Sequence, residues 1–194
     1  MHVTAQSINF LIIHGTMGSP EGNWFPWLKR ELEKAGHRVI VPSFPTPKEQ
    51  SLSTWLSVAE KTLKGLDPAN TVLIGHSTGA IFALYLAEKA TSAYCAVFAV
   101  CPFVRDLGLE QYDALNSTFV QPSFNWPLIR KNAKEIFCFA GKDDPYVPLP
   151  YASEVAEFAG APLTVIEKGG HLNAEFGFLE FPLLLDKIRQ TKLI

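Results

Sequence analysis

The sequence has few cysteines, no long block of like charge and no long apolar run. None of its three cysteines, Cys95, Cys101 and Cys138, belongs to a CxxC motif or shows metal-ligand spacing. We therefore expect small buried apolar side chains at these positions and no disulfide or redox pair. The longest mainly apolar run, residues 93–104, is shorter than the roughly 18 to 20 residues that a membrane-spanning helix requires.

The charges are balanced as well as dispersed. The chain has 17 basic and 19 acidic residues and a formal net charge of −2, which gives no electrostatic footprint for nucleic acid or an anionic membrane. Its first residues, MHVTAQSINFLII, lack the basic start and the apolar length of a signal peptide. We expect a cytoplasmic protein with neither nucleic acid nor a membrane as partner, and no feature indicates a protein partner.

Length and apolar content favour one core. A chain of 194 residues that is 47% hydrophobic can bury a single large core, so we expect one domain over residues 1–194. Short runs rich in β-branched residues, separated by amphipathic segments, predict six strands: residues 8–15, 37–42, 70–77, 93–102, 135–141 and 162–170. Because these runs are almost continuously apolar, they predict a parallel, doubly wound sheet with helices on both faces, an α/β fold.

The segments between these runs predict the helices. We expect them from Ser19–Pro20 to Gly36, from Ser51 along an apolar stripe, from Gly79 to Ala90, and over 150–159 and 174–190. One connection, residues 103–133, has no clean period and is long for a loop. We expect it to form a rim or short lid over a functional site.

Residues 75–79 read GHSTG, between a predicted strand and a predicted helix. This pattern is typical of a nucleophile elbow, in which Ser77 occupies a strained turn and projects its hydroxyl over the sheet. The spacing alone is weakly specific, because Ser77 could instead cap an ordinary helix. A nucleophilic serine also needs a base, and that base needs an acceptor to orient it.

Suitable partners follow the last two predicted strands. Asp143 and Asp144 come after the fifth strand, and His171 follows two glycines after the sixth. The carboxyl ends of parallel strands converge on one crevice, so Ser77, Asp144 and His171 can meet there. We prefer Asp144 because Pro145 biases it toward extended backbone. Asp143 remains an alternative, and either aspartate could instead serve a turn.

Acyl transfer also needs donors for the developing oxyanion. The Thr78 amide follows the proposed nucleophile, and the loop HGTMG at 14–18 is similar to the HGxxG-type loops of esterases. We expect Thr16 to supply the second amide, with Met17 as the alternative, and His14 chiefly to shape the loop. An apolar substrate pocket could be lined by the following residues: His14, Trp24, Phe119, Phe124 and Trp126. Trp24 could equally belong to the core.

These motifs, in this order, resemble a known family. The features that carry the resemblance are HGTMG (14–18), PSFPTP (42–47), GHSTGA (75–80), DLG (106–108), DDPYVP (143–148) and GGHLNAEF (169–176). The sequence is similar to the small serine hydrolases typified by retinoblastoma-binding protein nine and the bacterial YdeN-type esterases. The resemblance implies an α/β-hydrolase fold with six parallel strands, no large cap and a triad on Ser77, Asp144 and His171.

The sequence therefore predicts a serine hydrolase that cleaves carboxylic esters, thioesters or amides of small to medium acyl groups, with water as the second substrate. No histidine pair has metal-ligand spacing, so we expect no metal and no cofactor. The alternative is a hydrolase-fold binding module with incidental activity, because a fold does not dictate an activity. Against it, no LxCxE-like segment for a retinoblastoma-type interaction is present.

Overall fold

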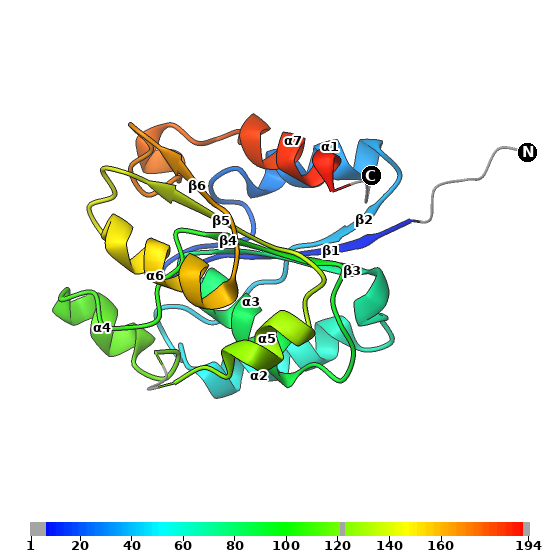
Figure 1. The fold of residues 1–194 in the computed structure, drawn as a ribbon, viewed down its shortest axis with the longest axis horizontal. Coiled ribbons are helices and arrows are strands. Elements are labelled where there is room, and N and C mark those ends of the chain that lie inside the picture. The colour runs from blue at the N-terminus through cyan, green and yellow to red at the C-terminus, as the bar shows by residue number, and fades with distance from the viewer. Residues whose placement is uncertain (1–6, 121–122, 192–194) are drawn as a thin grey trace, which may run out of the picture.

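A computed structural model describes residues 7–120 and 123–191, which form one all-parallel sheet of six strands (Figure 1). The strands are β1 (Asn9–Ile13), β2 (Arg38–Ile40), β3 (Thr71–His76), β4 (Ala96–Val100), β5 (Ile136–Gly141) and β6 (Leu163–Ile166). Each lies inside a run that the sequence predicts as a strand. The prediction of a parallel sheet with helices on both faces is confirmed.

Both faces of the sheet are buried. On one face Phe10 and Ile12 pack with α1 (Phe25–Lys34) and α7 (Pro182–Gln190). On the other face Leu11 and Ile13 share a core with α2 (Leu52–Leu63), α3 (Thr78–Lys89), α5 (Trp126–Lys131) and α6 (Leu149–Ala159). Figure 1 shows α1 and α7 above the sheet and α2, α3 and α5 below it. This two-sided cover explains why the strands read as continuous apolar runs.

The strand order positions the functional residues. The strands lie in the order β2-β1-β3-β4-β5-β6. From β1 the chain adds β2 on one side and then returns to add β3 on the other, so the topological switch point lies between β1 and β3. In open α/β sheets, ligands bind outside the carboxyl ends of the strands at such a switch point. The loops that leave β1 and β3 hold residues 14–18 and Ser77, which places both predicted motifs at this point.

Local signals explain where the helices begin. The helix α2 begins next to Ser51, where the sequence predicts its start, and the Ser51 hydroxyl accepts from the Thr54 amide in a capping box. The first helix is a correction, since it begins at Phe25 and not near Ser19. The proline of its first turn is Pro26, whereas the residues before it form turns, with Asn23 at φ 52°.

The last predicted helix is also a correction. Residues 174–190 are interrupted, because a short 3₁₀ turn, η2 (Ala174–Phe176), ends at Gly177 with φ 85°, and α7 starts only at Pro182. A second 3₁₀ turn, η1 (Pro68–Asn70), precedes β3.

Within 103–133 the structure has two short helices, α4 (Glu110–Asn116) and α5. None of the helices in the described part of the chain is long and apolar enough to cross a bilayer.

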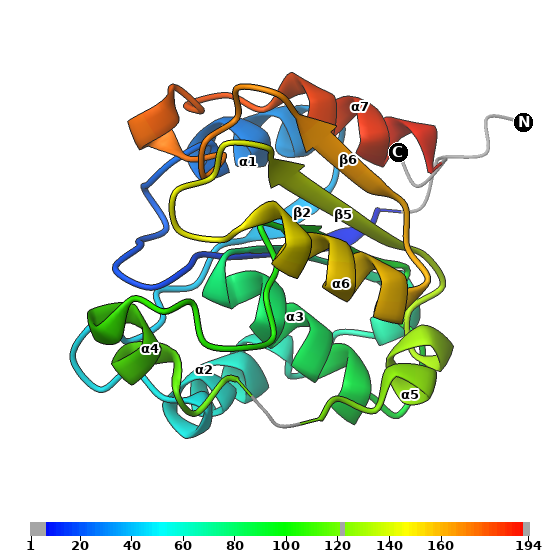
Figure 2. The same cartoon turned by 60° about the vertical axis from the view of Figure 1, so that its left-hand side comes forward.

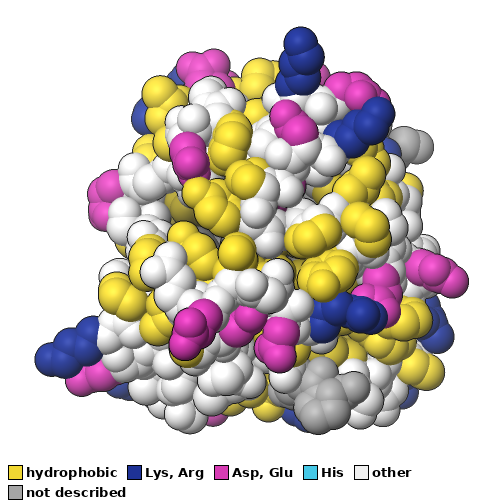
Figure 3. Space-filling model, turned by 90° about the vertical axis from the view of Figure 1, so that its left-hand side faces the viewer, with side chains coloured by type: hydrophobic (Ala, Val, Ile, Leu, Met, Phe, Trp, Pro, Cys, Tyr) yellow, Lys and Arg dark blue, Asp and Glu magenta, His cyan; other side chains and the backbone are white. Residues whose placement is uncertain are grey.

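Three distant segments gather at the carboxyl ends of the strands. Figure 2 shows α4, the loop after β1 and the segment before α7 at the same end of the strands. Figure 3 views the molecule from that end, where apolar side chains are interspersed with acidic ones. The candidate site lies among these segments.

Candidate active site

Ser77 occupies a strained turn between β3 and α3. Its backbone has φ 57° and ψ −123°, an unusual conformation for a residue with a side chain. Ser77 is the N-cap residue of α3, yet its side chain makes no capping hydrogen bond. The helix therefore does not use the hydroxyl, and the capping alternative has no support in the contacts. Strain of this kind is characteristic of functional sites.

Two glycines allow this turn to form. A Cβ at Gly75 would lie 2.2 Å from the carbonyl oxygen of Gly79, and a Cβ at Gly79 would lie 2.3 Å from the carbonyl oxygen of Ile13. Real Cβ atoms do not approach a backbone oxygen so closely. The glycines on either side of Ser77 are therefore required by the close approach of β1, β3 and the start of α3.

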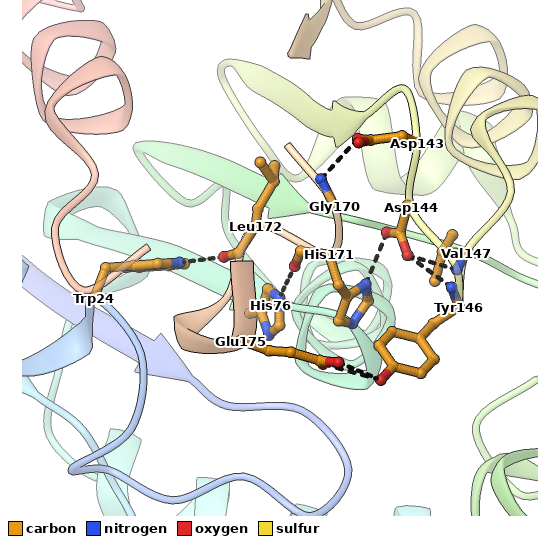
Figure 4. A network of polar contacts seen from close by, with 10 residues as sticks. All are labelled: Trp24, His76, Asp143, Asp144, Tyr146, Val147, Gly170, His171, Leu172 and Glu175. Carbon is orange, nitrogen blue, oxygen red and sulfur yellow. Dashed lines mark hydrogen bonds and ion pairs between the residues drawn. The ribbon is translucent and has the colours of Figure 1, made fainter. Parts of the chain in front are cut away.

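Asp144 and His171 form a buried pair. His171 Nδ1 lies 2.7 Å from Asp144 Oδ2, and the two side chains are 9% and 1% exposed (Figure 4). The other carboxylate oxygen, Oδ1, accepts from the amides of Tyr146 at 2.8 Å and Val147 at 3.0 Å. These bonds fix the carboxylate, which in turn fixes the orientation of the imidazole ring.

The environment of Asp144 keeps the carboxylate ionised. Burial acts to raise the pKa of Asp144, but the hydrogen bond and charge of His171 and the amides of Val147 and Tyr146 outweigh burial and hold the pKa below its usual value. Asp143, the sequence alternative, points elsewhere: its Oδ1 accepts from the Gly170 amide at 2.8 Å. Asp143 thus braces the loop that carries His171, and Asp144 contacts the ring.

Two further side chains hold the backbone of this loop. His76 Nε2 donates to the carbonyl oxygen of His171 at 2.8 Å, and Trp24 Nε1 donates to the carbonyl oxygen of Leu172 at 2.9 Å (Figure 4). Trp24 is fully buried in the core, so its assignment to the substrate pocket is wrong. The core alternative for Trp24 is confirmed, and His76 likewise packs against its neighbours, with its ring centroid 4.8 Å from that of His171.

Burial of His76 predicts acid sensitivity. Desolvation lowers the pKa of His76 to about 3 in the folded protein, whereas in the unfolded chain its value is near 6.5. Below pH 6.5 the unfolded state therefore binds a proton that the folded state does not, and stability falls as the pH falls toward 3. When the pH falls from about 6.5 to 4.5, this linkage lowers the free energy of unfolding by about 2 to 3 kcal/mol.

Urea unfolding at both pH values tests this prediction. We expect His76→Gln to lose less stability than the wild type on acidification, by about that amount. The lowered pKa of His14 contributes with the same sign in both proteins, so the difference isolates His76. Equal acid sensitivity of the two proteins would contradict the assignment of a buried neutral imidazole at this position.

The loop after β1 contains the two amides considered as the second oxyanion donor. The Met17 amide donates to Thr46 Oγ1 at 2.7 Å, so the alternative of Met17 as an oxyanion donor loses its support. Among the described residues, no hydrogen bond engages the Thr16 amide, and Thr16 lines the same cleft as Ser77. Thr78 is buried at the first position of α3, where an amide has no intrahelical acceptor. Thr16 and Thr78 are therefore available as donors.

His14 shapes this loop from beneath. It is fully buried, its Nδ1 donates to the carbonyl oxygen of Gly15 at 2.9 Å, and its Nε2 accepts from the Phe44 amide at 3.0 Å. Both ring nitrogens are thus occupied, and burial lowers the pKa of the imidazole. The structure contradicts the placement of His14 in the substrate pocket and matches its expected role as a loop residue.

The cleft itself has a volume of about 310 Å³. Its lining includes Ser77 and His171 and several side chains that sequence reasoning did not select: Leu107, Tyr112, Asn116, Tyr146, Asn173 and Glu175. Tyr146 lies in the motif DDPYVP close to Asp144 in sequence, and Glu175 lies in the motif GGHLNAEF close to His171. This closeness in sequence is the signal that could have identified them. The Tyr146 hydroxyl donates to both carboxylate oxygens of Glu175, at 3.1 and 2.9 Å.

The remaining aromatic residues assigned to the pocket are corrections. Phe119 is 1% exposed and packs against Trp55 with ring centroids 4.9 Å apart, inside the core. Phe124 is buried in the same core, and Trp126 on α5 packs against Phe158 in a separate groove. The segment 103–133 does border the cleft, but through Leu107, Tyr112 and Asn116.

One group of side chains has the composition of a metal site. Ligand atoms of His76, Cys101 and His171 lie within 4.8 Å of one another. However, burial raises the pKa of the Cys101 thiol well above its usual value. Because metals bind the thiolate, Cys101 is a poor metal ligand in this environment.

An all-parallel sheet of this order, with a strained serine after β3 and a histidine–aspartate pair beyond β5 and β6, defines an α/β-hydrolase fold. Within that class the chain belongs to the serine hydrolase family, whose model matches residues 10–190. The resemblance noted in the sequence is thereby confirmed.

Three comparisons agree with this assignment. The chain is 31% identical to YdeN of Bacillus subtilis (strain 168) over 180 residues, which cover 90% of this chain and 91% of YdeN. It is 32% identical to the serine hydrolase RBBP9 of Rattus norvegicus over 155 residues, 79% of this chain and 80% of RBBP9. The crystal structure of YdeN superimposes with a TM-score of 0.88 at 30% identity, covering 95% of this chain and 98% of YdeN.

Proposed function

We propose that this protein is a carboxylesterase-like serine hydrolase in which Ser77, His171 and Asp144 form the catalytic triad. The observation that carries the proposal is the 2.7 Å contact between His171 and a fixed Asp144 carboxylate, beside a cleft that also exposes the uncommitted hydroxyl of Ser77. A side chain held in this way can accept a proton from the serine and return it to a leaving group.

The reaction follows from this arrangement. Ser77 Oγ attacks the acyl carbonyl carbon while His171 Nε2 takes the hydroxyl proton, and the carbonyl oxygen becomes an oxyanion. The amides of Thr16 and Thr78 donate to this oxygen, and the N-terminal end of α3 adds favourable electrostatics. Collapse of the tetrahedral species expels the alcohol, which receives the proton from His171. Water then attacks the acyl-enzyme by the same steps and releases the acid.

The size of the cleft favours modest acyl groups. A volume of about 310 Å³ is at the small end of the range for ligand pockets. The test is turnover of nitrophenyl esters of increasing acyl length, with a matched thioester and anilide. We expect turnover of short and medium esters and a steep fall for long chains. A correctly folded protein that turns over none of these substrates would contradict the proposal and favour a binding role.

The charge of the cleft predicts a preference among acyl groups. Among the described residues that line it, Glu175 is the one carboxylate, and neither lysine nor arginine accompanies it. An acyl group that ends in a carboxylate would therefore be repelled. We expect Glu175→Gln to raise kcat/KM for a hemisuccinate ester, relative to a neutral ester of equal length, by roughly five- to tenfold.

Salt provides the control for this prediction. Glutamine keeps an oxygen that can accept from the Tyr146 hydroxyl, so the substitution removes charge with little change of shape. If the effect is electrostatic, it should shrink as the ionic strength rises. An anionic-to-neutral ratio that is the same in Glu175→Gln and the wild type would contradict the assignment.

A further inference from the structure

A buried polar cluster lies directly behind the two candidate oxyanion donors. The hydroxyls of Thr16 and Thr78 both lie against Asn116 Oδ1, at 2.7 and 2.8 Å, and are 2.8 Å from each other. Asn116 is the last residue of α4 and is 2% exposed. One side-chain oxygen thus joins the loop after β1, the start of α3 and α4, which are far apart in sequence.

The direction of the hydrogen bonds in this cluster can be worked out from one backbone carbonyl. The carbonyl oxygen of Leu115 can only accept, so the Gln50 atom 3.0 Å from it must be the NH₂ group. The opposite end of the amide is then Gln50 Oε1, which accepts from the Thr46 hydroxyl at 2.6 Å. The Thr46 oxygen in turn accepts from the Met17 amide at 2.7 Å.

The Gln50 NH₂ group then fixes the orientation of Asn116. Gln50 Nε2 donates to the carbonyl oxygen of Leu115 at 3.0 Å and to Thr16 Oγ1 at 2.8 Å, and it lies 3.1 Å from Asn116. The Asn116 atom that faces this donor must be an acceptor, because a flipped amide would place two NH₂ groups against each other. Asn116 Oδ1 therefore receives both threonine hydroxyl protons.

We propose that Asn116 is a positioning residue for the oxyanion hole. The two backbone amides that would bind the oxyanion belong to Thr16 and Thr78, on loops that leave different strands. Their side chains share one acceptor, so Asn116 holds the spacing of these amides without touching the substrate carbonyl itself. This role rests on the proposed function, because it concerns the stabilisation of the oxyanion formed in that reaction.

The same contacts restrict the rim of the cleft. The C-terminal end of α4 is tied to Gln50 through Leu115 and Asn116, and to both oxyanion loops through Asn116. Movement of this end of α4 would break one buried and several part-buried hydrogen bonds, which are costly to leave unmade. This part of the 103–133 segment therefore belongs to the site as a fixed wall, and its displacement would disturb the oxyanion donors.

The test is Asn116→Ala, assayed with a nitrophenyl ester and with a trifluoromethyl ketone, which forms a tetrahedral adduct with an active-site serine. We expect kcat to fall by about 10- to 100-fold while KM changes by less than about threefold, since misplaced amides weaken binding of the transition state and not of the substrate. The affinity for the ketone should fall by a factor similar to the loss in kcat/KM.

A matched control comes from another buried asparagine. Asn132 is 5% exposed, and its Nδ2 donates to the carbonyl oxygens of Ala87 and Ala90, remote from the cleft. Asn132→Ala should lower the unfolding midpoint without the loss of kcat. Thr16→Val and Thr16→Ser form a second pair: valine removes the hydroxyl and should lower kcat, whereas serine restores the donor and should recover most of that rate.

The outcomes separate this role from the proposed function. A folded Asn116→Ala with kcat and ketone affinity within about twofold of the wild type overturns the positioning role alone, because the wild-type chemistry is then intact. The same holds if Thr16→Ser is as slow as Thr16→Val. A wild type that neither hydrolyses esters nor binds the ketone overturns the proposed function and this role with it.

Discussion

Replacing Ser77 by alanine is expected to lower kcat for a short-chain nitrophenyl ester by about 10⁶-fold, the loss seen when the nucleophile of a serine hydrolase is removed. The reason is that the acyl-enzyme of the proposed mechanism forms on the Ser77 hydroxyl, which alanine lacks. The residual rate, from the oxyanion donors and substrate binding, should stay above the uncatalysed rate. Steady-state kinetics of the purified variant measure the effect.

The fold of the Ser77→Ala variant must be checked in parallel. The Ser77 side chain makes no capping hydrogen bond with α3, so its loss should leave the unfolding midpoint within a few degrees of the wild type. A folded variant that keeps more than about a hundredth of the wild-type kcat would show that the ester is cleaved elsewhere. That result would contradict the assignment of Ser77 as nucleophile.

Replacing Asp144 by asparagine is expected to lower kcat by about 10⁴-fold, although the change is nearly isosteric. The carboxylate now accepts from His171 Nδ1 at 2.7 Å and from two backbone amides. An asparagine amide can keep the backbone bonds through its oxygen, but it then presents NH₂ to the ring. This stabilises the wrong histidine tautomer and removes the charge that balances the imidazolium.

Asp143→Asn is the matched comparison. Asp143 Oδ1 accepts from the Gly170 amide, and asparagine retains an oxygen for this bond. We expect a change in kcat of less than about tenfold, since the variant alters the bracing of the loop and not the contact with the ring. If Asp143→Asn is the slower of the two variants, the acid of the triad has been misassigned. Measuring both against the same ester settles the order.

The sheet was predictable from sequence because burial on two faces leaves a direct record. In β3, for example, the neighbouring residues Leu73 and Ile74 face different cores on opposite sides of the sheet, so both positions must be apolar. Asp144 and His171 were predictable as residues near the cleft for a related reason, since the carboxyl ends of parallel strands converge. The choice of Asp144 over Asp143 required only the bias that Pro145 imposes on its backbone.

The start of the first helix was less predictable, because two prolines, Pro20 and Pro26, each lie at a position that can mark the first turn of a helix. Pro20 and Pro26 both follow residues that can begin a helix, but only Pro26 lies in the first turn of α1. The turns before it, including Asn23, line the cleft. A single sequence does not reveal that these residues are used for the site and not for a helix.

The pocket assignments failed because the sequence shows which side chains are aromatic but not whether they point into the cleft or into the core. Phe119 and Trp126 are aromatic and lie in the segment that borders the cleft, but Phe119 packs against Trp55 and Trp126 against Phe158. Asn116 was missed for the opposite reason. A lone asparagine has no motif, and its role depends on Thr16, 100 residues away, and Thr78, 38 residues away.

The most direct test of the proposed triad is covalent labelling with a fluorophosphonate, followed by peptide mass spectrometry. An activated Ser77 predicts one adduct per chain, carried by that serine, that forms quickly in the wild type and in Asp143→Asn. It should form far more slowly in Asp144→Asn and not at all in Ser77→Ala. An adduct on any other residue, or a folded wild type that stays unlabelled, would contradict the claim that Ser77 is an activated nucleophile.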